Sequence, residues 1–140
     1  MNDALAWEIR LERPDDGPQI EALVDLAFGP GRFAKTTYRL REGVEPDGRL
    51  GFVAEARAGA LLGSVRFWPI MVGGKLSLLL GPLAVHTASR GRGIGVALMT
   101  HGIEAARAAH YETVLLVGDE TYYARVGLDR KSTRLNSSHT

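Results

Sequence analysis

The chain has 140 residues, of which 45% are hydrophobic and 24% charged, and its formal net charge is +1. This composition fits one globular domain, and the lack of cysteine excludes a disulfide framework and a thiol nucleophile. No apolar run is long enough to span a membrane, and no signal peptide opens the chain, so a cytoplasmic location is expected. The near-neutral charge predicts neither a nucleic-acid nor a membrane partner.

The segment Asp129–His139 is polar and aperiodic, and it resembles the in-frame translation of a sequencing-adapter oligonucleotide. We therefore expect a domain at residues 1–128 that lacks its C-terminal strands, and a non-native, disordered tail at 129–140. A natural disordered tail is the alternative. The segment holds three basic residues and one acidic residue, so the formal net charge without it falls from +1 to −1.

The first part of the chain predicts one strand and two helices. Apolar and charged residues alternate over Trp7–Arg13, which indicates a half-buried strand. A helix follows, capped by Asp15 or Asp16, and runs to about Phe28 before a Gly-Pro-Gly stop. A second, basic helix is expected over Phe33–Glu42, where a solvated face is favoured over a ligand-binding patch.

Three strands then form an antiparallel meander. They are expected at Leu50–Ala56, Ala60–Val72 and Lys75–Val85, and short glycine-containing turns link them. Pro69 predicts a bend or bulge in the second of these strands, and Pro82 predicts one in the third, because proline cannot donate to the strand ladder.

The rest of the chain is organised around the unit that follows. The third strand leads into a glycine turn at Ser89–Gly95 and then into an amphipathic helix over Val96–His110. The apolar run Glu112–Val117 predicts a buried strand, parallel to the third because a helix connects them. A short helix is expected at Tyr122–Val126.

The glycine turn has the chemistry of an anion site. The first N–H groups of a helix lack intrahelical partners and carry partial positive charge. Gly91, Gly93 and Gly95 allow close approach of a phosphate, and Arg90 and Arg92 add charge beside it. The pattern is neither the dinucleotide fingerprint nor a P-loop. It predicts a pyrophosphate cradle, and a merely structural strand–helix turn is the alternative.

With these residues, the chain resembles the GNAT N-acetyltransferases. Arg90, Gly93 and Gly95 match the family's Arg/Gln-x-x-Gly-x-Gly/Ala motif for acetyl-CoA, and Leu83–His86 is similar to the strand that precedes it. Thr87 departs from the proline of many members. The resemblance covers roughly residues 9–128 and is weak before residue 51.

The resemblance implies a fold and a cofactor site. The expected fold is α/β, with a mixed central sheet of an antiparallel meander plus a splayed parallel pair, flanked by helices. Acetyl-CoA, as co-substrate, would lie where the parallel strands splay apart. The residues that would bind it are Leu83, Ala84, Val85, Arg90, Gly91, Arg92, Gly93, Ile94 and Gly95.

The resemblance also implies catalytic groups. Tyr123 stands in a segment similar to the family's Tyr-x-x-x-Gly-Phe motif and would protonate the CoA sulfur, while the backbone N–H of Val85 would hold the oxyanion. The alternative for Tyr123 is packing of a short helix. The base stays open, with a water chain as one option and these side chains as the others: Glu55, His86, Asp119 and Glu120.

The predicted function is transfer of an acetyl group from acetyl-CoA to a primary amine, by direct attack in a ternary complex. The alternatives are a non-catalytic acyl-CoA sensor or interaction module on the same fold, and a nucleotide-binding protein. The acceptor is a small molecule or a protein amine, to which Phe33 and Tyr38 are candidate contacts. A homodimer is possible in this family, and no spacing of histidines and acids predicts a metal site.

Overall fold

The computed structural model describes residues 6–28 and 45–116. The predicted helices at Phe33–Glu42 and Tyr122–Val126, together with the tail, lie outside the described residues. The strands are β1 (Trp7–Leu11), β2 (Phe52–Ala56), β3 (Leu61–Val72), β4 (Lys75–Val85) and β5 (Val114–Leu116). The helices are α1 (Gly17–Phe28), α3 (Ile94–Ala108) and two 3-10 helices, Pro14–Asp16 and Thr87–Ser89.

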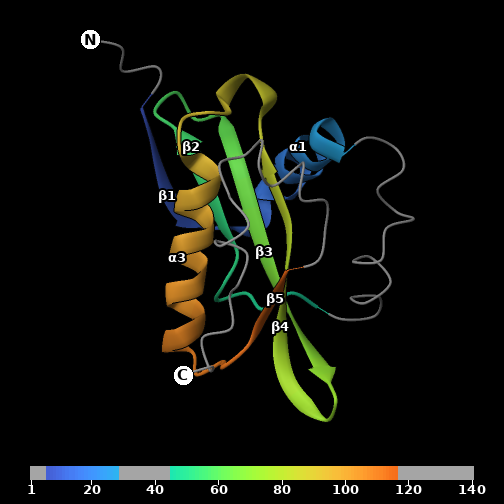
Figure 1. Cartoon of the computed structure of the whole chain (residues 1–140). Helices are drawn as coiled ribbons and strands as arrows, with labels where there is room; N and C mark the ends of the chain where they lie inside the picture. The colour runs from blue at the N-terminus through green and yellow to red at the C-terminus, as the bar shows by residue number, and fades with distance from the viewer. Residues whose placement is uncertain (1–5, 29–44, 117–140) are drawn as a thin grey trace.

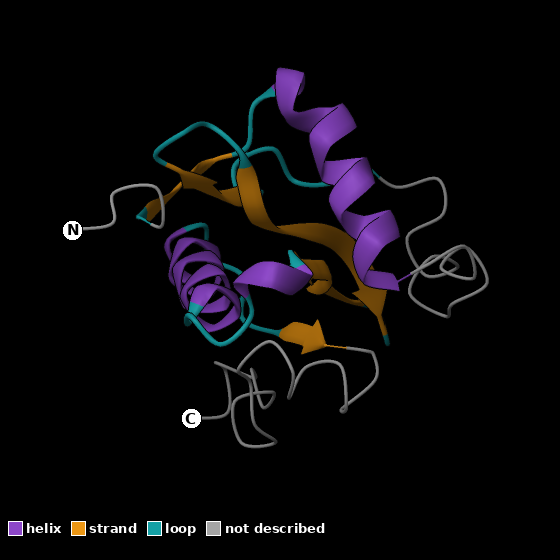
Figure 2. Ribbon diagram, turned by 90° about the horizontal axis from the view of Figure 1, so that it is seen from above, coloured by secondary structure: helices purple, strands orange, loops and turns teal. Residues whose placement is uncertain are grey.

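The five strands form one mixed sheet in the order β1-β2-β3-β4-β5 (Figure 1). The first four are antiparallel neighbours, and β5 lies parallel to β4, with Leu78 opposite Val114. Helix α1 covers one face of the sheet and α3 the other (Figure 2). The predicted α/β architecture, with an antiparallel meander and a parallel pair, is therefore confirmed.

Two apolar clusters hold these layers together. The larger one lies between the sheet and α3, where Phe67, Leu98 and Leu83 are fully buried. The smaller one lies under α1 and includes Ile20 and Val53. Alternation along the strands sends successive side chains to opposite faces, so β2, β3 and β4 each contribute to both clusters.

The two faces of β1 are not simply buried and exposed, as the alternation predicts. Leu11 is 46% exposed, whereas the side chain of Arg10, on the polar face, is only 17% exposed. Arg10 binds Asp16 and Glu55, and Arg66 of β3 binds Glu12. The polar face of β1 is therefore ion-paired next to α1, an arrangement that alternation alone cannot reveal.

Of the two irregularities predicted from prolines in the long strands, the structure contains one. The register of β3 with β4 is regular at Pro69, which lies opposite Leu78, so the bulge predicted there is wrong. The register shifts between Val65 and Phe67, where β4 carries the extra residue at Gly81-Pro82, and the predicted break at Pro82 is confirmed. Proline at residue 69 fits because no β2 residue pairs with it in the described sheet.

Candidate active site

The irregularity at Gly81-Pro82 divides β4 into two parts. Residues Leu78–Leu80 pair with both β3 and β5, whereas the pairs described for Leu83–Val85 are with residues 63–65 of β3. The indole Nε1 of Trp68 donates a hydrogen bond to the carbonyl oxygen of Gly81 and holds the break in place. Among the described residues, which end at residue 116, the last pair of β4 with β5 joins Leu80 to Leu116.

The backbone of Val85 is directed away from β3. The N–H of His86 donates to the carbonyl of Leu62 at 2.8 Å, which makes Leu62 and His86 a hydrogen-bonded pair. In an antiparallel ladder, residues alternate between bonding to the neighbour and facing the other edge. The N–H and C=O groups of Val85 therefore point to the β5 side, while its side chain is buried in the α3 cluster.

A tight loop connects this edge to α3. The Nδ1 atom of His86 accepts the N–H of Ala88 at 3.1 Å and caps the 3-10 helix Thr87–Ser89. Gly91 and Gly93 then adopt φ angles of +87° and +82°, a region that side chains with a Cβ atom rarely occupy. These two glycines are required by the turn itself, whatever the loop binds.

Helix α3 begins two residues before its predicted start. Gly93 is its N-cap and Ile94 its first residue, so Gly95 lies in the first helical turn and not in the loop. The first helical bond runs from the N–H of Ala97 to the carbonyl of Gly93 at 3.0 Å. The N–H groups of residues 94–96 precede it and have no acceptor within the helix.

The N-terminus of α3 has the electrostatic character of an anion site. No acidic residue stands in its first turn, and no side chain caps it. The partial positive charge of the helix end is therefore not neutralised from within the helix. Arg90 and Arg92, both partly exposed, precede this end in the loop. Their guanidinium groups are suited to phosphate oxygens.

Some of the residues predicted to bind acetyl-CoA have side chains that are buried and cannot contact a ligand. Ile94 is only 1% exposed and packs against β3, where a Cβ atom on Gly63 would lie 2.8 Å from its Cγ2. Ala84 is fully buried in the cluster under α1. Only backbone groups of these two residues are available to a ligand, and glycine at residue 63 lets α3 lie close to the sheet.

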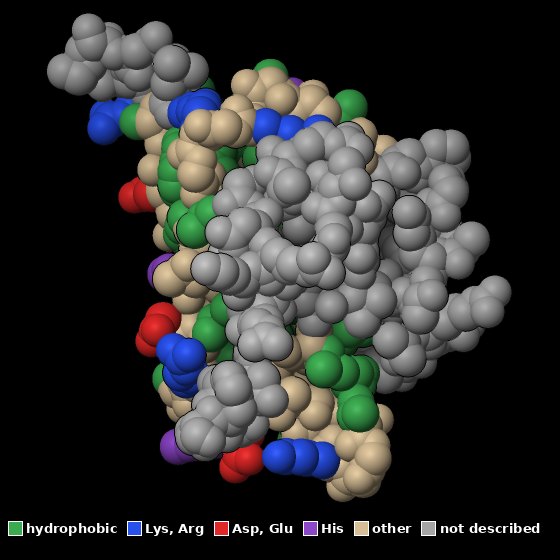
Figure 3. All heavy atoms as spheres, viewed as in Figure 1, with side chains coloured by type: hydrophobic (Ala, Val, Ile, Leu, Met, Phe, Trp, Pro, Cys, Tyr) green, Lys and Arg blue, Asp and Glu red, His purple; other side chains and the backbone are tan. Residues whose placement is uncertain are grey.

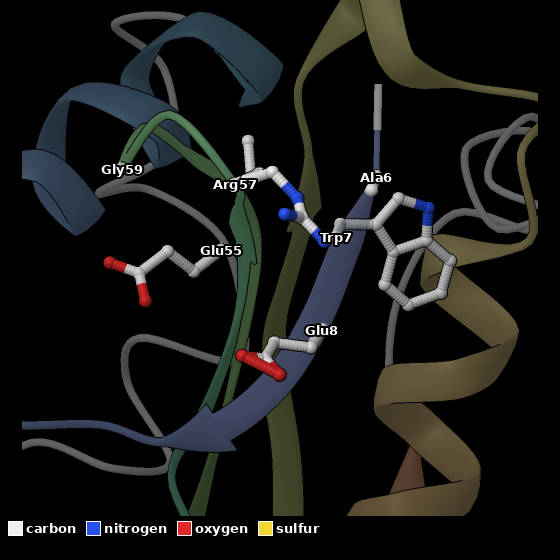
Figure 4. A pocket seen from close by; sticks show the side chains of 7 residues that line it. Ala6, Trp7, Glu8, Glu55, Arg57 and Gly59 are labelled. Carbon is white, nitrogen blue, oxygen red and sulfur yellow. The ribbon is translucent and has the colours of Figure 1, made fainter. Parts of the chain in front are cut away.

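The candidate bases have different surroundings. Glu55 lies on β2, separated from β4 by β3, and accepts a 3.0 Å hydrogen bond from Arg10. It lines a pocket of about 310 Å³ with Glu8, its cross-strand neighbour (Figure 4). Trp7 points to the opposite side, toward α3. His86, in contrast, adjoins the Val85 edge directly, although its Nδ1 atom already serves as a cap.

Several predicted site residues lie outside the described residues. They are Tyr123, Asp119 and Glu120, together with the acceptor-site candidates Phe33 and Tyr38. Among residues 6–28 and 45–116, no group of histidines and acids could hold a metal ion. No helix within these same ranges is long and apolar enough to cross a membrane.

The sequence-based view missed the contacts that hold the parts of the site together. One is the bond from Trp68 to Gly81, and another is the fit of Phe67 against Gly102 on α3. Glycine inside a predicted helix was a signal for the second, because a helical glycine often marks close packing. No local pattern identifies the first.

A strand edge, a glycine loop and an open helix end thus form a candidate anion site, and similarity to known proteins shows that the chain is an acetyltransferase by family. The chain matches the model of the acetyltransferase (GNAT) family over residues 18–127. It is 36% identical over 125 residues to the N-acetyltransferase YhbS of Escherichia coli, covering 86% of this chain and 72% of that protein. The chain therefore belongs to the GNAT acetyltransferase family.

Two solved structures give the same result. One is a GNAT family acetyltransferase from Brucella melitensis in complex with acetyl-CoA, with 32% identity and a TM-score of 0.66 over 90% of this chain and 84% of that chain. The other is YhbS from Escherichia coli in complex with CoA, with 34% identity and a TM-score of 0.69 over 92% and 72% of the two chains.

Proposed function

We propose that this chain transfers an acetyl group from acetyl-CoA to a primary amine, by direct attack of the amine in a ternary complex. One observation carries the proposal: the outward-facing backbone of Val85 leads, through a short glycine loop, to the open N-terminus of α3 at Gly93. Relatives whose structures hold acetyl-CoA or CoA support the same donor.

The donor fits the two ends of this unit. Its pyrophosphate would accept hydrogen bonds from the first N–H groups of α3, with Arg90 and Arg92 balancing its charge. Gly91 and Gly93 have no Cβ atom, and no other atom lies within 4 Å of where one would stand. The pantetheine arm would run beside Leu83–Val85 as an added strand, hydrogen-bonded to the backbone groups of Val85, which point to the β5 side.

Acetyl transfer needs a donor for the oxyanion, an acid for the leaving thiolate and a base for the amine proton. The lone pair of the neutral amine attacks the thioester carbonyl, a C–N bond forms, and the oxyanion accepts a hydrogen bond from the N–H of Val85. Collapse of this intermediate breaks the C–S bond, and the phenol of Tyr123 gives its proton to the departing thiolate.

A base then takes the proton that the amine nitrogen loses. The candidates are His86, Asp119, Glu120, or a water chain to solvent. The bond from Arg10 makes Glu55 the least suited of the acids to this role. Direct attack by the amine requires no covalent acyl-enzyme, and the sequence has no cysteine that could serve as a thiol nucleophile.

The proposal extends to the partners and boundaries of the protein. The acceptor is a small-molecule or protein amine, and neither nucleic acid nor membrane takes part. We place the enzyme in the cytoplasm, with its domain at residues 1–128 and a non-native tail at 129–140. None of these statements is needed for donor binding.

Calorimetric titration of acetyl-CoA into the full chain tests the donor site. We expect micromolar binding that weakens by at least about 100-fold when both arginines of the loop are replaced, in Arg90→Ala with Arg92→Ala. Arg107→Ala, at the opposite end of α3, is the matched control and should bind normally. Absence of binding by the folded wild type would overturn the proposal.

Turnover separates an enzyme from a sensor. Release of the CoA thiol in the presence of an amine panel should be measurable, and Tyr123→Phe should lower kcat by about 100-fold or more with little change in acetyl-CoA affinity. A sensor would bind acetyl-CoA, show no turnover and tolerate this substitution. A nucleotide-binding protein would bind ATP or NAD without competition from CoA.

A further inference from the structure

In the first part of β4, every second residue directs its backbone N–H and C=O groups toward β5. The N–H of Leu78 donates to the carbonyl oxygen of Thr113 at 3.0 Å, so the backbone groups of Leu78 face β5. Alternation gives Leu80 the same direction. If β4 were regular throughout, residues 82 and 84 would continue this set, because residues two apart in a strand face the same edge.

The irregularity at Gly81-Pro82, which we call the bulge, moves this set by one residue. Val65 lies opposite Leu83 and Phe67 lies opposite Leu80, so two steps along β3 correspond to three steps along β4. After the extra residue, Leu83 and Val85 face the side on which β5 lies, as the bond from the next N–H to the carbonyl of Leu62 requires.

This shift decides which N–H groups a ligand beside the second part of β4 can reach. In a regular strand they would belong to residues 82 and 84, and Pro82 has no N–H group. With the bulge, the N–H of Val85 faces this edge instead, while Ala84 pairs with Ser64 of β3. The oxyanion donor of the proposed reaction therefore depends on the bulge.

Trp68 of β3 binds the bulge directly. Its indole Nε1 donates to the carbonyl oxygen of Gly81 at 2.5 Å. Trp68 lies opposite Leu79, two residues before Gly81, and diagonal neighbours in a sheet are within reach of a large aromatic side chain. Gly81 is buried, so a donor for its carbonyl oxygen favours the bulged conformation over a regular strand.

We propose that Trp68 is a positioning residue for acetyl transfer: its indole N–H holds the bulge at Gly81 and thereby directs the N–H of Val85 to the thioester. This role acts through the backbone of β4 and needs no contact between Trp68 and a substrate. The inference rests on the proposed function, because it concerns the same oxyanion donor.

Removal of the indole N–H alone tests this role. The benzothiophene analogue of tryptophan, placed at residue 68, keeps both fused rings and has sulfur in place of the N–H group. We expect kcat for CoA release, with the most reactive amine of the panel, to fall by about tenfold to 100-fold, because the oxyanion donor is misplaced in the transition state. Inhibition by ADP, which has a pyrophosphate but no pantetheine arm, should change by no more than about twofold.

Trp7 provides the matched control, since it is the only other tryptophan in the chain. It lies on β1, at the opposite edge of the described sheet from β5, and points toward α3 (Figure 4). Figure 3 shows apolar side chains at the surface over β1 and α3. Trp7→Phe should leave kcat unchanged, whereas Trp68→Phe should lower it as the analogue does. Circular dichroism shows whether each protein is folded.

Amide hydrogen exchange in the free protein gives a second test, which needs no ligand and no turnover. The N–H of Ala84 is bonded within the sheet, whereas the N–H of Val85 points away from β3. Val85 should therefore exchange at least about tenfold faster than Ala84. Loss of the indole donor should narrow this difference, because β4 can then pair with β3 in either phase.

Three results would overturn the inference. An active wild type whose kcat is unchanged by the analogue would remove the indole N–H from the reaction. Equal losses of kcat and of ADP inhibition would mean that Trp68 supports the fold as a whole. Faster exchange at Ala84 than at Val85 would contradict the phase of the strand. A folded wild type without turnover would instead overturn the proposed function, and this inference with it.

Discussion

Arg10 on β1 and Asp16 in the 3-10 helix before α1 are joined by two parallel hydrogen bonds, each 2.9 Å long. The backbone N–H of Arg13 donates a further bond of 2.7 Å to Asp16. These groups favour the carboxylate, so the pKa of Asp16 lies below its ordinary value, chiefly through Arg10 and despite the opposing effect of burial. This contact fixes the entry of α1 on the sheet.

Replacement of Asp16 by Asn should therefore destabilise the fold by about 2 kcal/mol at pH 7, because it leaves the largely buried guanidinium of Arg10 with Glu55 as its remaining carboxylate partner. Because the folded pKa of Asp16 is lowered, its contribution is full above the ordinary pKa of 3.8 and is lost as the pH falls through the folded value. Urea unfolding at several pH values measures this difference.

The exposed neighbour Asp15 provides the control for this prediction. Asp15→Asn should change the free energy of unfolding by no more than about 0.5 kcal/mol at any pH. A gap between wild type and Asp16→Asn that stays constant from pH 7 to pH 2 would contradict the assigned role of the Asp16 carboxylate.

Gly102 of α3 packs directly on the ring of Phe67, and a Cβ atom added there would overlap the ring carbons. Gly102→Ala should thus destabilise the protein by about 1 to 2 kcal/mol, although alanine is the better helix former by about 1 kcal/mol. Gly17→Ala at the start of α1 has open space and should be neutral or slightly stabilising. Thermal unfolding of the three proteins measures both effects.

A second substitution tests the cause. In a Phe67→Leu background, Gly102→Ala should lose less stability than in the wild type, with a coupling energy of at least about 0.5 kcal/mol. Additive effects of the two substitutions would mean that the glycine is needed for another reason.

The order of the elements could be predicted because their signals are local. Hydrophobic alternation, turn glycines and the Pro82 break each act within a few residues, and all reappear in the sheet. Contacts between distant residues could not be predicted in this way. The pairing of Arg66 with Glu12, for example, joins residues 54 positions apart and depends on how the strands lie in the sheet, which no single segment encodes.

In the candidate site too, the features set by local sequence could be predicted, and those set by tertiary packing could not. The glycine loop is a local motif, so its positive φ angles at Gly91 and Gly93 were predictable from residue type. The start of α3 was placed two residues late, because glycine argues against a helix unless packing requires it. Gly95 is buried in the first turn, where tertiary packing outweighs its low helix propensity.

Backbone strain and ligand binding can be separated by comparing two glycines. Gly93 has φ +82° in the loop before α3 and Gly59 has φ +103° in the β2–β3 turn, and neither has an atom within 4 Å of the position of an added Cβ. Alanine at either residue should destabilise the fold by about 1 to 2 kcal/mol. Only Gly93→Ala should also weaken acetyl-CoA binding, by about tenfold or more, as calorimetry would show. Equal affinities would remove this glycine from the proposed cradle.

Tyr111, just after α3, donates a 3.1 Å hydrogen bond to Asp47 in the loop before β2. Burial, and then this bond, raise the pKa of the phenol above its ordinary value of 10.0. Because the folded pKa is raised, the stabilisation is full below pH 10 and is lost as the pH rises through the folded value.

Tyr111→Phe should therefore destabilise the protein by about 1 kcal/mol at pH 7, and by less at strongly alkaline pH. Tyrosine absorbance near 295 nm, followed during alkaline titration, should show a late-ionising phenol in the wild type that is missing in Tyr111→Phe. The exposed carboxylate variant Glu104→Gln, on α3, should leave this titration unchanged. If the free energy of unfolding of wild type and of Tyr111→Phe falls by the same fraction above pH 10, the hydrogen bond from Tyr111 to Asp47 does not stabilise the contact between α3 and the loop before β2.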